Sequence, residues 1–134
     1  MKDDMLWKNK RILLTGHTGF KGSWLSLWLA DLGAEVHGVA LPPATQPNLY
    51  NTARIPTLLA SDTYLDICNL TELKKLINTV KPEVVFHLAA QSLVQYSYDA
   101  PIETYAVNVM GTANVLEAIR CCDAVRAAVI VTTD

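Results

Sequence analysis

The segment from Arg11 to Trp24 constrains the fold more than any other part of the chain. It begins with an apolar run typical of a buried strand, passes through glycines and continues as a helix-forming sequence. The glycines stand at Gly16, Gly19 and Gly22, which is a Gly-x-x-Gly-x-x-Gly spacing. In a strand–turn–helix unit such glycines permit a sharp exit from the strand, close approach of a diphosphate and tight helix packing. The spacing predicts a dinucleotide-binding turn, and the alternative is a purely structural turn.

The composition is typical of a single globular domain. Hydrophobic residues make up 51% of the 134 residues and charged residues 18%, which suits a buried sheet covered by helices. The formal net charge is −2, and no basic patch favours nucleic acid or an anionic membrane as a partner. The first residues lack the apolar core of a secretory signal, and no apolar segment is long enough to span a bilayer. We therefore expect a cytoplasmic protein.

Cysteines and histidines are few and form no recognisable site. They are Cys68, Cys121, Cys122, His17, His37 and His87. The cysteines lack the spacing of a disulfide framework, and the histidines are too far apart in sequence to form a metal-ligand pattern with them. We expect no metal, and reduced thiols packed as small apolar groups.

Strand-like and helix-like apolar patterns alternate along the chain. The expected strands are 11–16, 35–41, part of 58–67, 83–90 and 127–132, and the expected helices are 20–32, 69–80 and 101–120. This alternation predicts an α/β fold with a Rossmann-like, doubly wound parallel sheet. Ligands of such sheets bind beyond the carboxyl ends of the strands. The strand ends at Gly16, Gln91 and Asp134 are therefore expected to share one crevice.

Further expectations concern the packing of individual segments. Helix 20–32 carries apolar residues around much of its circumference, which predicts burial on two sides. Segment 42–55 is rich in Pro and Asn and is expected to be a surface excursion. Tyr105 is expected in the core, and His87, inside an apolar strand, is expected to be a core histidine with its hydrogen bonds satisfied.

Four ordered motifs carry a resemblance to a known family. They are Thr15-Gly-His-Thr-Gly-Phe-Lys-Gly22, His87-Leu-Ala-Ala-Gln91, Tyr105-Ala-Val-Asn-Val-Met-Gly-Thr112 and Val131-Thr-Thr-Asp134. The chain resembles the extended short-chain dehydrogenase/reductase superfamily and, within it, is most similar to the CDP-glucose 4,6-dehydratases. The resemblance implies NAD as cofactor and a nucleotide-linked hexose as substrate. Hydride would leave C4, water would be lost from C5 and C6, and the hydride would return to C6.

The resemblance also implies which residues act. Thr133 would hydrogen-bond the C4 hydroxyl, and Asp134 would protonate the departing C6 hydroxyl as a general acid. Gln91 and Ser92 could reach the hexose, or could belong to a simple polar loop. The expected cofactor-binding residues are Gly16, His17, Thr18, Gly19, Phe20, Lys21, Gly22, Asp66, Ile67, Leu88, Ala89, Ala90, Asn108 and Thr132.

Some of these residues have a structural alternative. Lys21 could pair with a phosphate or lie exposed, and His17 could be a turn residue that faces solvent. Asp66 could accept a hydrogen bond from adenine or act as a helix cap. Asn108 is poorly suited to a helix interior; a buried amide tying the fourth strand to the fifth near the cofactor would explain it, and the alternative is a solvent-facing side chain.

Two features of the sequence qualify the resemblance. The second strand ends in Val39-Ala40-Leu41-Pro42, with neither the acid that usually holds the adenosine ribose nor an arginine for a 2′-phosphate. We therefore expect NAD, bound more loosely than usual. The loop after Gln91 also lacks an arginine expected in this subfamily.

The family's Tyr-x-x-x-Lys pair and its substrate domain are absent from this sequence. We therefore expect residues 1–134 to form an NAD-binding Rossmann domain truncated at the end of the fifth strand and inactive alone. The rival functions are an epimerase or reductase of the same superfamily, which does not need Asp134 as an acid, and a non-catalytic NAD-binding module. Helix 101–120 has a broad apolar face and forms a dimer interface in the family, so a homodimer is expected.

Overall fold

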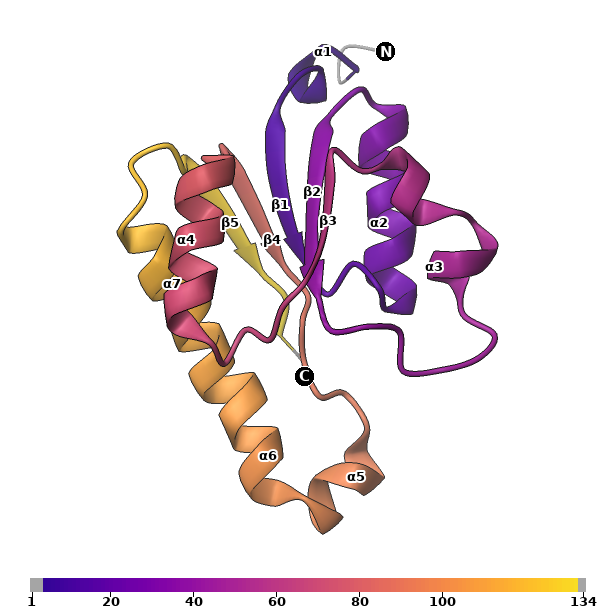
Figure 1. Ribbon diagram of the computed structural model, residues 1–134, viewed down its shortest axis with the longest axis vertical. Coiled ribbons are helices and arrows are strands. Elements are labelled where there is room, and N and C mark those ends of the chain that lie inside the picture. The colour runs from indigo at the N-terminus through magenta and orange to yellow at the C-terminus, as the bar shows by residue number, and fades with distance from the viewer. Residues whose placement is uncertain (1–3, 133–134) are drawn as a thin grey trace.

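The computed structural model describes residues 4–132 and contains a five-stranded parallel sheet (Figure 1). The strands are β1 (Arg11–Thr15), β2 (Glu35–Ala40), β3 (Ser61–Tyr64), β4 (Val84–His87) and β5 (Ala127–Ile130). Their order is β3-β2-β1-β4-β5, so the chain winds outward from β1 in both directions. The predicted doubly wound parallel sheet is confirmed.

Helices cover both faces of the sheet. They are α1 (Asp4–Trp7), α2 (Phe20–Asp31), α3 (Leu49–Thr52), the 3-10 turn η1 (Ile55–Leu58), α4 (Leu70–Val80), α5 (Val94–Asp99), α6 (Pro101–Tyr105), the π-helical turn η2 (Ala106–Gly111) and α7 (Thr112–Arg120). Helix α2 packs on one face, and α4 and α7 lie side by side on the other (Figure 1). Of the helices within residues 4–132, none combines the length and apolarity needed to cross a bilayer.

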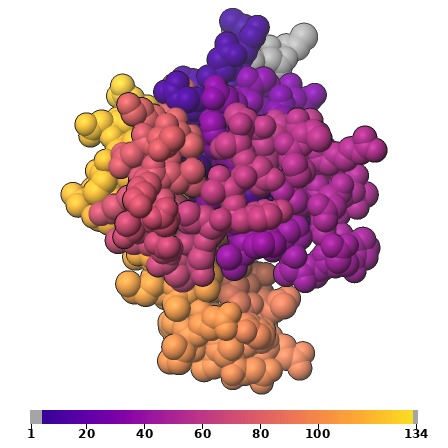
Figure 2. All heavy atoms as spheres, in the orientation of Figure 1, coloured from indigo at the N-terminus to yellow at the C-terminus, as the bar shows by residue number. Residues whose placement is uncertain are grey.

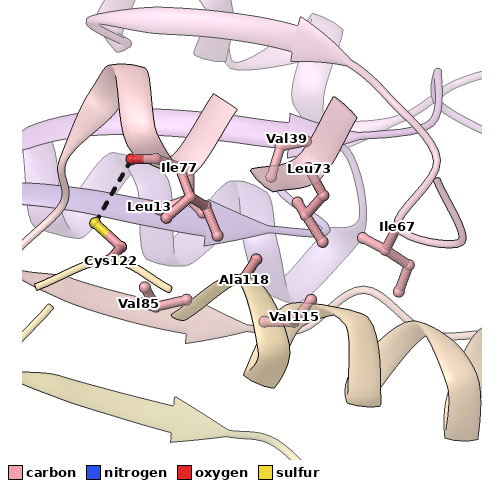
Figure 3. Packing of buried hydrophobic residues seen from close by; sticks show 9 residues of the cluster. All are labelled: Leu13, Val39, Ile67, Leu73, Ile77, Val85, Val115, Ala118 and Cys122. Atoms are coloured by element: carbon pink, nitrogen blue, oxygen red, sulfur yellow. Dashed lines mark hydrogen bonds between the residues drawn. The ribbon is translucent and has the colours of Figure 1, made fainter. Parts of the chain in front are cut away.

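The core reflects the alternation of side chains along β1. Leu13 points to the face covered by α4 and α7, whereas Ile12 and Leu14 point to the face covered by α2. Figure 3 shows the first of these clusters, in which Leu13 meets residues of β2, β4, α4 and α7. Its members are Leu13, Val39, Ile67, Leu73, Ile77, Val85, Val115, Ala118 and Cys122. Each large apolar side chain buried in this way contributes about 1.5–3 kcal/mol.

Helix α2 packs on the sheet and also contacts α3 and η1, but the prediction that its large apolar residues are buried on two sides is wrong, because the tryptophans point outward. The residues that face the sheet are mostly small, namely Gly22, Ser23, Ser26 and Leu29. Small side chains let the helix approach the sheet closely. The large apolar residues therefore point outward, and Trp24 and Trp28 are 53% and 65% exposed.

The expected long helix 101–120 is present, but a π-helical turn interrupts it. Helices α6 and α7 are joined through η2 without a break. A π turn inserts extra backbone into a helix and thereby rotates the side chains on either side of it. Together, α5 and α6 protrude from the body of the molecule (Figure 2). Tyr105 is 68% exposed there, so its predicted place in the core is wrong.

Of two further expectations, that for the cysteines is corrected in part. Cys68 and Cys121 are exposed free thiols, and only Cys122 is packed as a small apolar group. The excursion 42–55 lies at the surface, as predicted. It contains α3 and leads into η1, whose Tyr50 and Ile55 are buried, and both elements contact α2.

Candidate cofactor-binding site

The turn after β1 can be made only with glycine at its two ends. Gly16 has φ +78°, and a Cβ there would lie 2.7 Å from the amide nitrogen of Ala89. A Cβ at Gly22 would lie 2.0 Å from the carbonyl oxygen of Gly16, which is shorter than any tolerable contact. Backbone hydrogen bonds hold the turn, since Gly16 N–H donates to Val39 O at 2.9 Å and Gly19 N–H donates to Gly16 O at 3.1 Å.

The N-terminus of α2 is open where the turn ends. Gly19 is the N-cap residue, and no side chain caps this end of the helix. The first N–H groups of a helix have no intrahelical acceptor and form the positive end of its dipole. A Cβ built at Gly19 would meet only Gly16 O, at 3.4 Å, so this position is free of steric crowding. Such an end is suited to a phosphate group.

A groove of about 590 Å³ runs past this helix end. Three segments that are distant in sequence form it: the glycine turn, the excursion after β2 and the segment after β4. Its lining residues are Thr18, Gly19, Phe20, Ala44, Thr45, Pro47, Asn48, Leu49, Ala90, Gln91, Ser92, Leu93 and Tyr96. Six of the residues expected at the site therefore meet in one groove.

Side-chain hydrogen bonds hold the segment after β4. Thr15 Oγ1 accepts from Leu88 N–H and from Ala89 N–H, both at 3.0 Å. Asn108 holds Gln91 at two points, because its Oδ1 accepts from Gln91 N–H at 2.8 Å and its Nδ2 donates to Gln91 O at 3.0 Å. The solvent-facing alternative for Asn108 is wrong. Its amide ties the π-helical turn to the segment after β4, whereas a bond to the fifth strand had been expected.

His17 lies beneath the turn, so the solvent-facing alternative for this residue is wrong as well. Its side chain is fully buried, and its Nε2 is 2.6 Å from Asp62 Oδ1. The Tyr50 hydroxyl donates to the other oxygen of Asp62, and burial together with this bond raises the pKa of Tyr50 above its ordinary value. The His17 ring also fills the space above Gly38, where a Cβ would lie 2.5 Å from the ring.

Other expected residues lie outside the groove. Lys21 is exposed on the outer face of α2, where it lines a separate hollow with Trp24 and Trp28. Thr132 is exposed after the end of β5. Thr133 and Asp134, the expected catalytic residues, lie outside the described residues.

Asp66 and Ile67 make contacts with the protein itself. Asp66 Oδ1 accepts from Cys68 N–H at 2.9 Å, and the N-cap of α4 is Asn69, so the helix-cap alternative for Asp66 is wrong. Ile67 is 4% exposed and belongs to the core cluster of Figure 3. Its side chain fits against Gly111, where a Cβ would lie 2.5 Å from Ile67 Cδ1.

Sequence reasoning missed the contribution of the excursion after β2. Thr45, Asn48 and Leu49 line the groove. One local signal was available, because Asn48 precedes α3 and its side chain accepts from Asn51 N–H at 2.8 Å, as an N-cap residue does. The pairing of Asp62 with His17 had no such signal, because it depends on how β3 lies in the sheet. Across residues 4–132, no group of three or more His, Cys, Asp or Glu side chains could hold a metal ion.

Comparison with models of protein families identifies the family to which the chain belongs. A family model described as GDP-mannose 4,6 dehydratase matches residues 13–133. The chain belongs to the GDP-mannose 4,6-dehydratase family. Within this family it is 48% identical to CDP-glucose 4,6-dehydratase of Salmonella typhimurium over 134 residues, which is 100% of this chain and 37% of that protein. The chain thus spans little more than a third of the length of this dehydratase.

Solved structures confirm the fold of this dehydratase-family chain. Epimerase Mth375 of Methanothermobacter thermautotrophicus matches with a TM-score of 0.79 and 27% identity, over 97% of this chain and 37% of that one. UDP-glucose 4-epimerase of Brucella ovis, solved in complex with NAD, matches with a TM-score of 0.77 and 23% identity, over 90% of this chain and 35% of that one. The expected resemblance to the extended short-chain dehydrogenase/reductases is confirmed.

Proposed function

We propose that this chain is the NAD-binding part of a sugar-nucleotide 4,6-dehydratase that acts on CDP-glucose. The observation that carries the proposal is the uncapped N-terminus of α2, which opens on a groove at the carboxyl edge of a parallel sheet. The choice of CDP-glucose follows the 48% identity to the Salmonella dehydratase. Residues 1–134 would then be a Rossmann domain, with the substrate domain in the longer relatives.

The close backbone packing at Gly16 and Gly22 and the uncrowded position at Gly19 support a dinucleotide at this turn. Gly19 and Phe20 would face the diphosphate, and Ala89 and Ala90 would leave room for the nicotinamide ribose. Asp66 and Ile67 would flank the adenine. Ile67 would do so through its backbone, because its side chain is in the core. The other proposed cofactor residues are Gly16, His17, Thr18, Lys21, Gly22, Leu88, Asn108 and Thr132. His17 and Asn108 would act by shaping the turn and the segment after β4.

The surroundings of β2 favour NAD over NADP. No carboxylate or arginine follows Ala40, where an exposed leucine, Leu41, continues the chain. Asp62 of the neighbouring β3 is already bound to His17 and Tyr50. The adenosine ribose would therefore be held without an acidic side chain at the end of β2, and NAD would bind with reduced affinity.

The chain's own residues would hold the hexose and move one proton. NAD, when bound, would supply a hydride acceptor for C4 of the sugar and a hydride donor for C6. Thr133 would hydrogen-bond the C4 hydroxyl, and Asp134 would protonate the C6 hydroxyl as it leaves. Gln91 and Ser92, which line the groove, would contact the hexose. Because the Tyr-x-x-x-Lys pair is absent, the 134 residues alone would not turn over substrate.

The protruding helices offer a surface for a second copy of the chain. Large apolar side chains lie exposed along α5, α6 and η2, and they are Tyr98, Ile102, Tyr105, Val109 and Met110. A standard interface buries about 800 Å² on each partner, and exposed large apolar side chains on consecutive helical elements suit such an interface. We include a homodimer through residues 101–120 in the proposal.

A charge placed at the helix end tests the NAD site. Gly19 has extended backbone angles, so Gly19→Asp and Gly19→Asn would both cap α2 and leave its stability equal or higher. The aspartate would also repel a diphosphate, so we expect NAD to bind at least about tenfold more weakly to Gly19→Asp than to Gly19→Asn by calorimetry. Equal affinities, or no NAD binding by the unaltered chain, would contradict the proposal.

The product separates this proposal from its closest rival. An epimerase or reductase of the same superfamily would share the cofactor residues but would not form a 4-keto-6-deoxy sugar. Incubation of the full-length protein with CDP-glucose and NAD, followed by NMR of the product, distinguishes the two. In that protein, Asp134→Asn should stall the loss of water while oxidation at C4 continues. A 4-epimer as the product would contradict the dehydratase assignment.

A further inference from the structure

A buried histidine joins the two strands that frame the groove. His87 ends β4, is 3% exposed, and stands opposite Thr15 of β1 in the sheet. Its Nδ1 is 2.6 Å from Thr15 Oγ1, and its Nε2 is 3.0 Å from Thr112 Oγ1 of α7. The prediction of a satisfied core histidine is confirmed. Its hydrogen-bond partners also determine which nitrogen carries the proton.

Thr15 has only one hydrogen to give. A hydroxyl group donates once and accepts through two lone pairs. The Thr15 oxygen already accepts from Leu88 N–H and Ala89 N–H, so its hydrogen is directed at His87 Nδ1. Nδ1 of His87 must therefore be the unprotonated, accepting nitrogen.

The direction of the remaining bonds follows from this assignment. With Nδ1 unprotonated, the ring proton is on Nε2 and is donated to Thr112 Oγ1. The Thr112 hydroxyl in turn donates to the backbone oxygen of Asn108, at 2.7 Å. Hydrogen bonds thus run in one direction from Ala89 N–H through Thr15, His87 and Thr112 to Asn108.

Both ends of this series of hydrogen bonds hold the segment after β4. At one end it holds Leu88 and Ala89, and at the other it ends on Asn108, whose side chain clamps Gln91. We propose that His87, as the neutral Nε2–H tautomer, is a positioning residue that fixes residues 88–91, of which Ala90 and Gln91 line the groove. That this part of the groove faces a dinucleotide rests on the proposed function, but the tautomer and the fixed segment do not.

The surroundings of His87 keep it neutral. Burial lowers its pKa below the ordinary value, and neither of its hydrogen-bond partners is charged. The charged residues on the packed elements β1 and α7 are engaged elsewhere: Arg11 donates to Lys81 O, and Glu117 pairs with Arg120 and Lys74. The β4–β5 pairing places Ile130 opposite His87, and β5 and η2 carry no charged residue.

Protonation of His87 would break the chain of bonds. A hydrogen on Nδ1 would meet the hydroxyl hydrogen of Thr15, so Thr15 Oγ1 would have to accept from His87 and lose its bond from Ala89 N–H or from Leu88 N–H, the second of which also donates to Thr15 O at 3.1 Å. Because the folded-state pKa is lowered, the unfolded chain takes up the proton first. The free energy of unfolding should therefore fall as the pH drops below about 6.5, the ordinary value for histidine.

Nuclear magnetic resonance of the chain labelled with 15N-histidine tests the tautomer directly. Long-range 1H–15N correlations should show an unprotonated Nδ1 and a protonated Nε2 for His87 throughout the pH range in which the chain is folded. Thr15→Val should shift the Nδ1 resonance, and Thr112→Val should shift the Nε2 resonance. A proton on Nδ1 at neutral pH would overturn the proposal.

Variants of His87 test its positioning role. His87→Ala should speed hydrogen exchange at Ala89 and weaken NAD binding roughly fivefold to tenfold, the effect of one lost hydrogen bond. His87→Asn keeps an acceptor near Nδ1, so it should restore both quantities to within about twofold and remove the loss of stability below pH 6.5. His37→Asn, on β2 and bound to Ser61, is the matched control and should change neither.

The outcomes separate this inference from the proposed function. If the unaltered chain binds no NAD but His87 shows the assigned tautomer and controls exchange at Ala89, the proposed function fails and the positioning role stands. If NAD binds equally well to His87→Ala, and exchange at Ala89 is unchanged, the positioning role is wrong and the proposed function stands.

Discussion

The two walls of the groove are built in different ways. The wall formed by the glycine turn is held by backbone in contact with backbone, to the point that a Cβ at Gly22 would lie 2.0 Å from Gly16 O. The wall that contains Ala90 and Gln91 is held by side chains acting on residues 88–91, with Thr15 beneath this segment and Asn108 beside it. The first wall therefore admits no side chain at its tightest points and is supported from beneath by the His17–Asp62 pair, whereas the second is held by side-chain hydrogen bonds to its own backbone.

This difference determines how each wall can fail. Any added side chain at the tightest points of the first wall forces backbone atoms apart, which costs a large part of the stability of a small domain. Loss of one side chain from the second wall removes hydrogen bonds that each contribute about 1 kcal/mol. A single substitution at the tightest points of the first wall should therefore cost much of the free energy of unfolding, whereas a single substitution in the second wall should cost about as much as the hydrogen bonds it removes.

The sharpest test of the comparison is Gly22→Ala. Because the Gly16 carbonyl cannot move without breaking the turn, we expect a loss of about 3 kcal/mol or more in the free energy of unfolding, measured with urea. Gly19→Ala is the matched control, since its Cβ would be 3.4 Å from the same oxygen and should cost less than about 1 kcal/mol. Similar losses in the two variants would show that backbone contact does not define this wall.

Asp62→Ala tests the support beneath the glycine turn. It would leave His17 Nε2 buried without a partner, and Nδ1 of the same ring already has none among the described residues. We expect a loss of about 2–3 kcal/mol in the free energy of unfolding. Asp66→Ala removes a carboxylate that accepts a single backbone N–H at the surface, and it should cost under about 1 kcal/mol. If Asp66→Ala proved the more costly, the support would lie elsewhere.

Asn108→Ala tests the second wall. It removes both bonds to the backbone of Gln91, so we expect a loss of about 1–2 kcal/mol and faster hydrogen exchange at the Gln91 amide. Asn114→Ala, on the same continuous helix, removes one bond to Ile67 O and should leave exchange at Gln91 unchanged. Unchanged exchange in Asn108→Ala would mean that this wall does not depend on the Asn108 side chain.

The hydrogen bond between Tyr50 and Asp62 supports the first wall, and its contribution to stability should depend on pH. Burial and the bond to Asp62 raise the pKa of Tyr50 in the folded chain. Its contribution to stability is therefore complete below the unfolded pKa of about 10 and is lost as the pH rises above that value. Tyr50→Phe should cost about 1 kcal/mol at neutral pH and reduce the alkaline loss in unfolding measurements. Tyr98→Phe, at a tyrosine that is exposed in the monomer, should change neither when the measurement is made on the monomer, and an unaltered alkaline profile in Tyr50→Phe would count against this role.

Substitutions in α5 and α6, which follow the segment after β4, are expected to change stability least. Tyr98→Ser combined with Ile102→Ser replaces side chains that are 81% and 82% exposed, so at a protein concentration where the chain is monomeric the free energy of unfolding should change by less than about 0.5 kcal/mol. The same variant should dissociate the proposed homodimer in analytical ultracentrifugation. Trp28→Ser, on the outer face of α2, controls for the loss of any exposed apolar group. Dissociation by Trp28→Ser alone would move the interface to α2.

The glycine turn and the sheet could be predicted from sequence because local rules govern them. The contacts that restrict Gly19 and Gly22 lie within one strand–turn–helix unit, although those of Gly16 reach Leu88 and Ala89 after β4. The parallel sheet follows from the alternation of apolar strands and amphipathic helices. Gly33 ends α2 with φ +82°, as a glycine after a helix commonly does.

The second wall and the packing of α2 depend on contacts between distant segments, so they could be predicted only in part from sequence patterns. Asn108 is an unusual residue for a helix interior, but its pairing with Gln91 depends on the π-helical turn, which the sequence pattern does not reveal. The outward tryptophans of α2 were misjudged, because the number of apolar residues on a helix does not reveal that small residues face the sheet. His17 was misjudged for a similar reason, since Asp62 reaches it from a strand placed two positions away in the sheet order.

The contact between the His17 ring and Gly38 has a consequence for the evolution of this turn. The imidazole occupies the volume that a side chain on β2 would need, so a histidine at position 17 is compatible only with a bare backbone at position 38. A relative that carries a small residue at 17 is released from that restriction and can accept alanine or valine at 38. The two positions should therefore covary, and exchanging either one alone between relatives should be less tolerated than exchanging the pair.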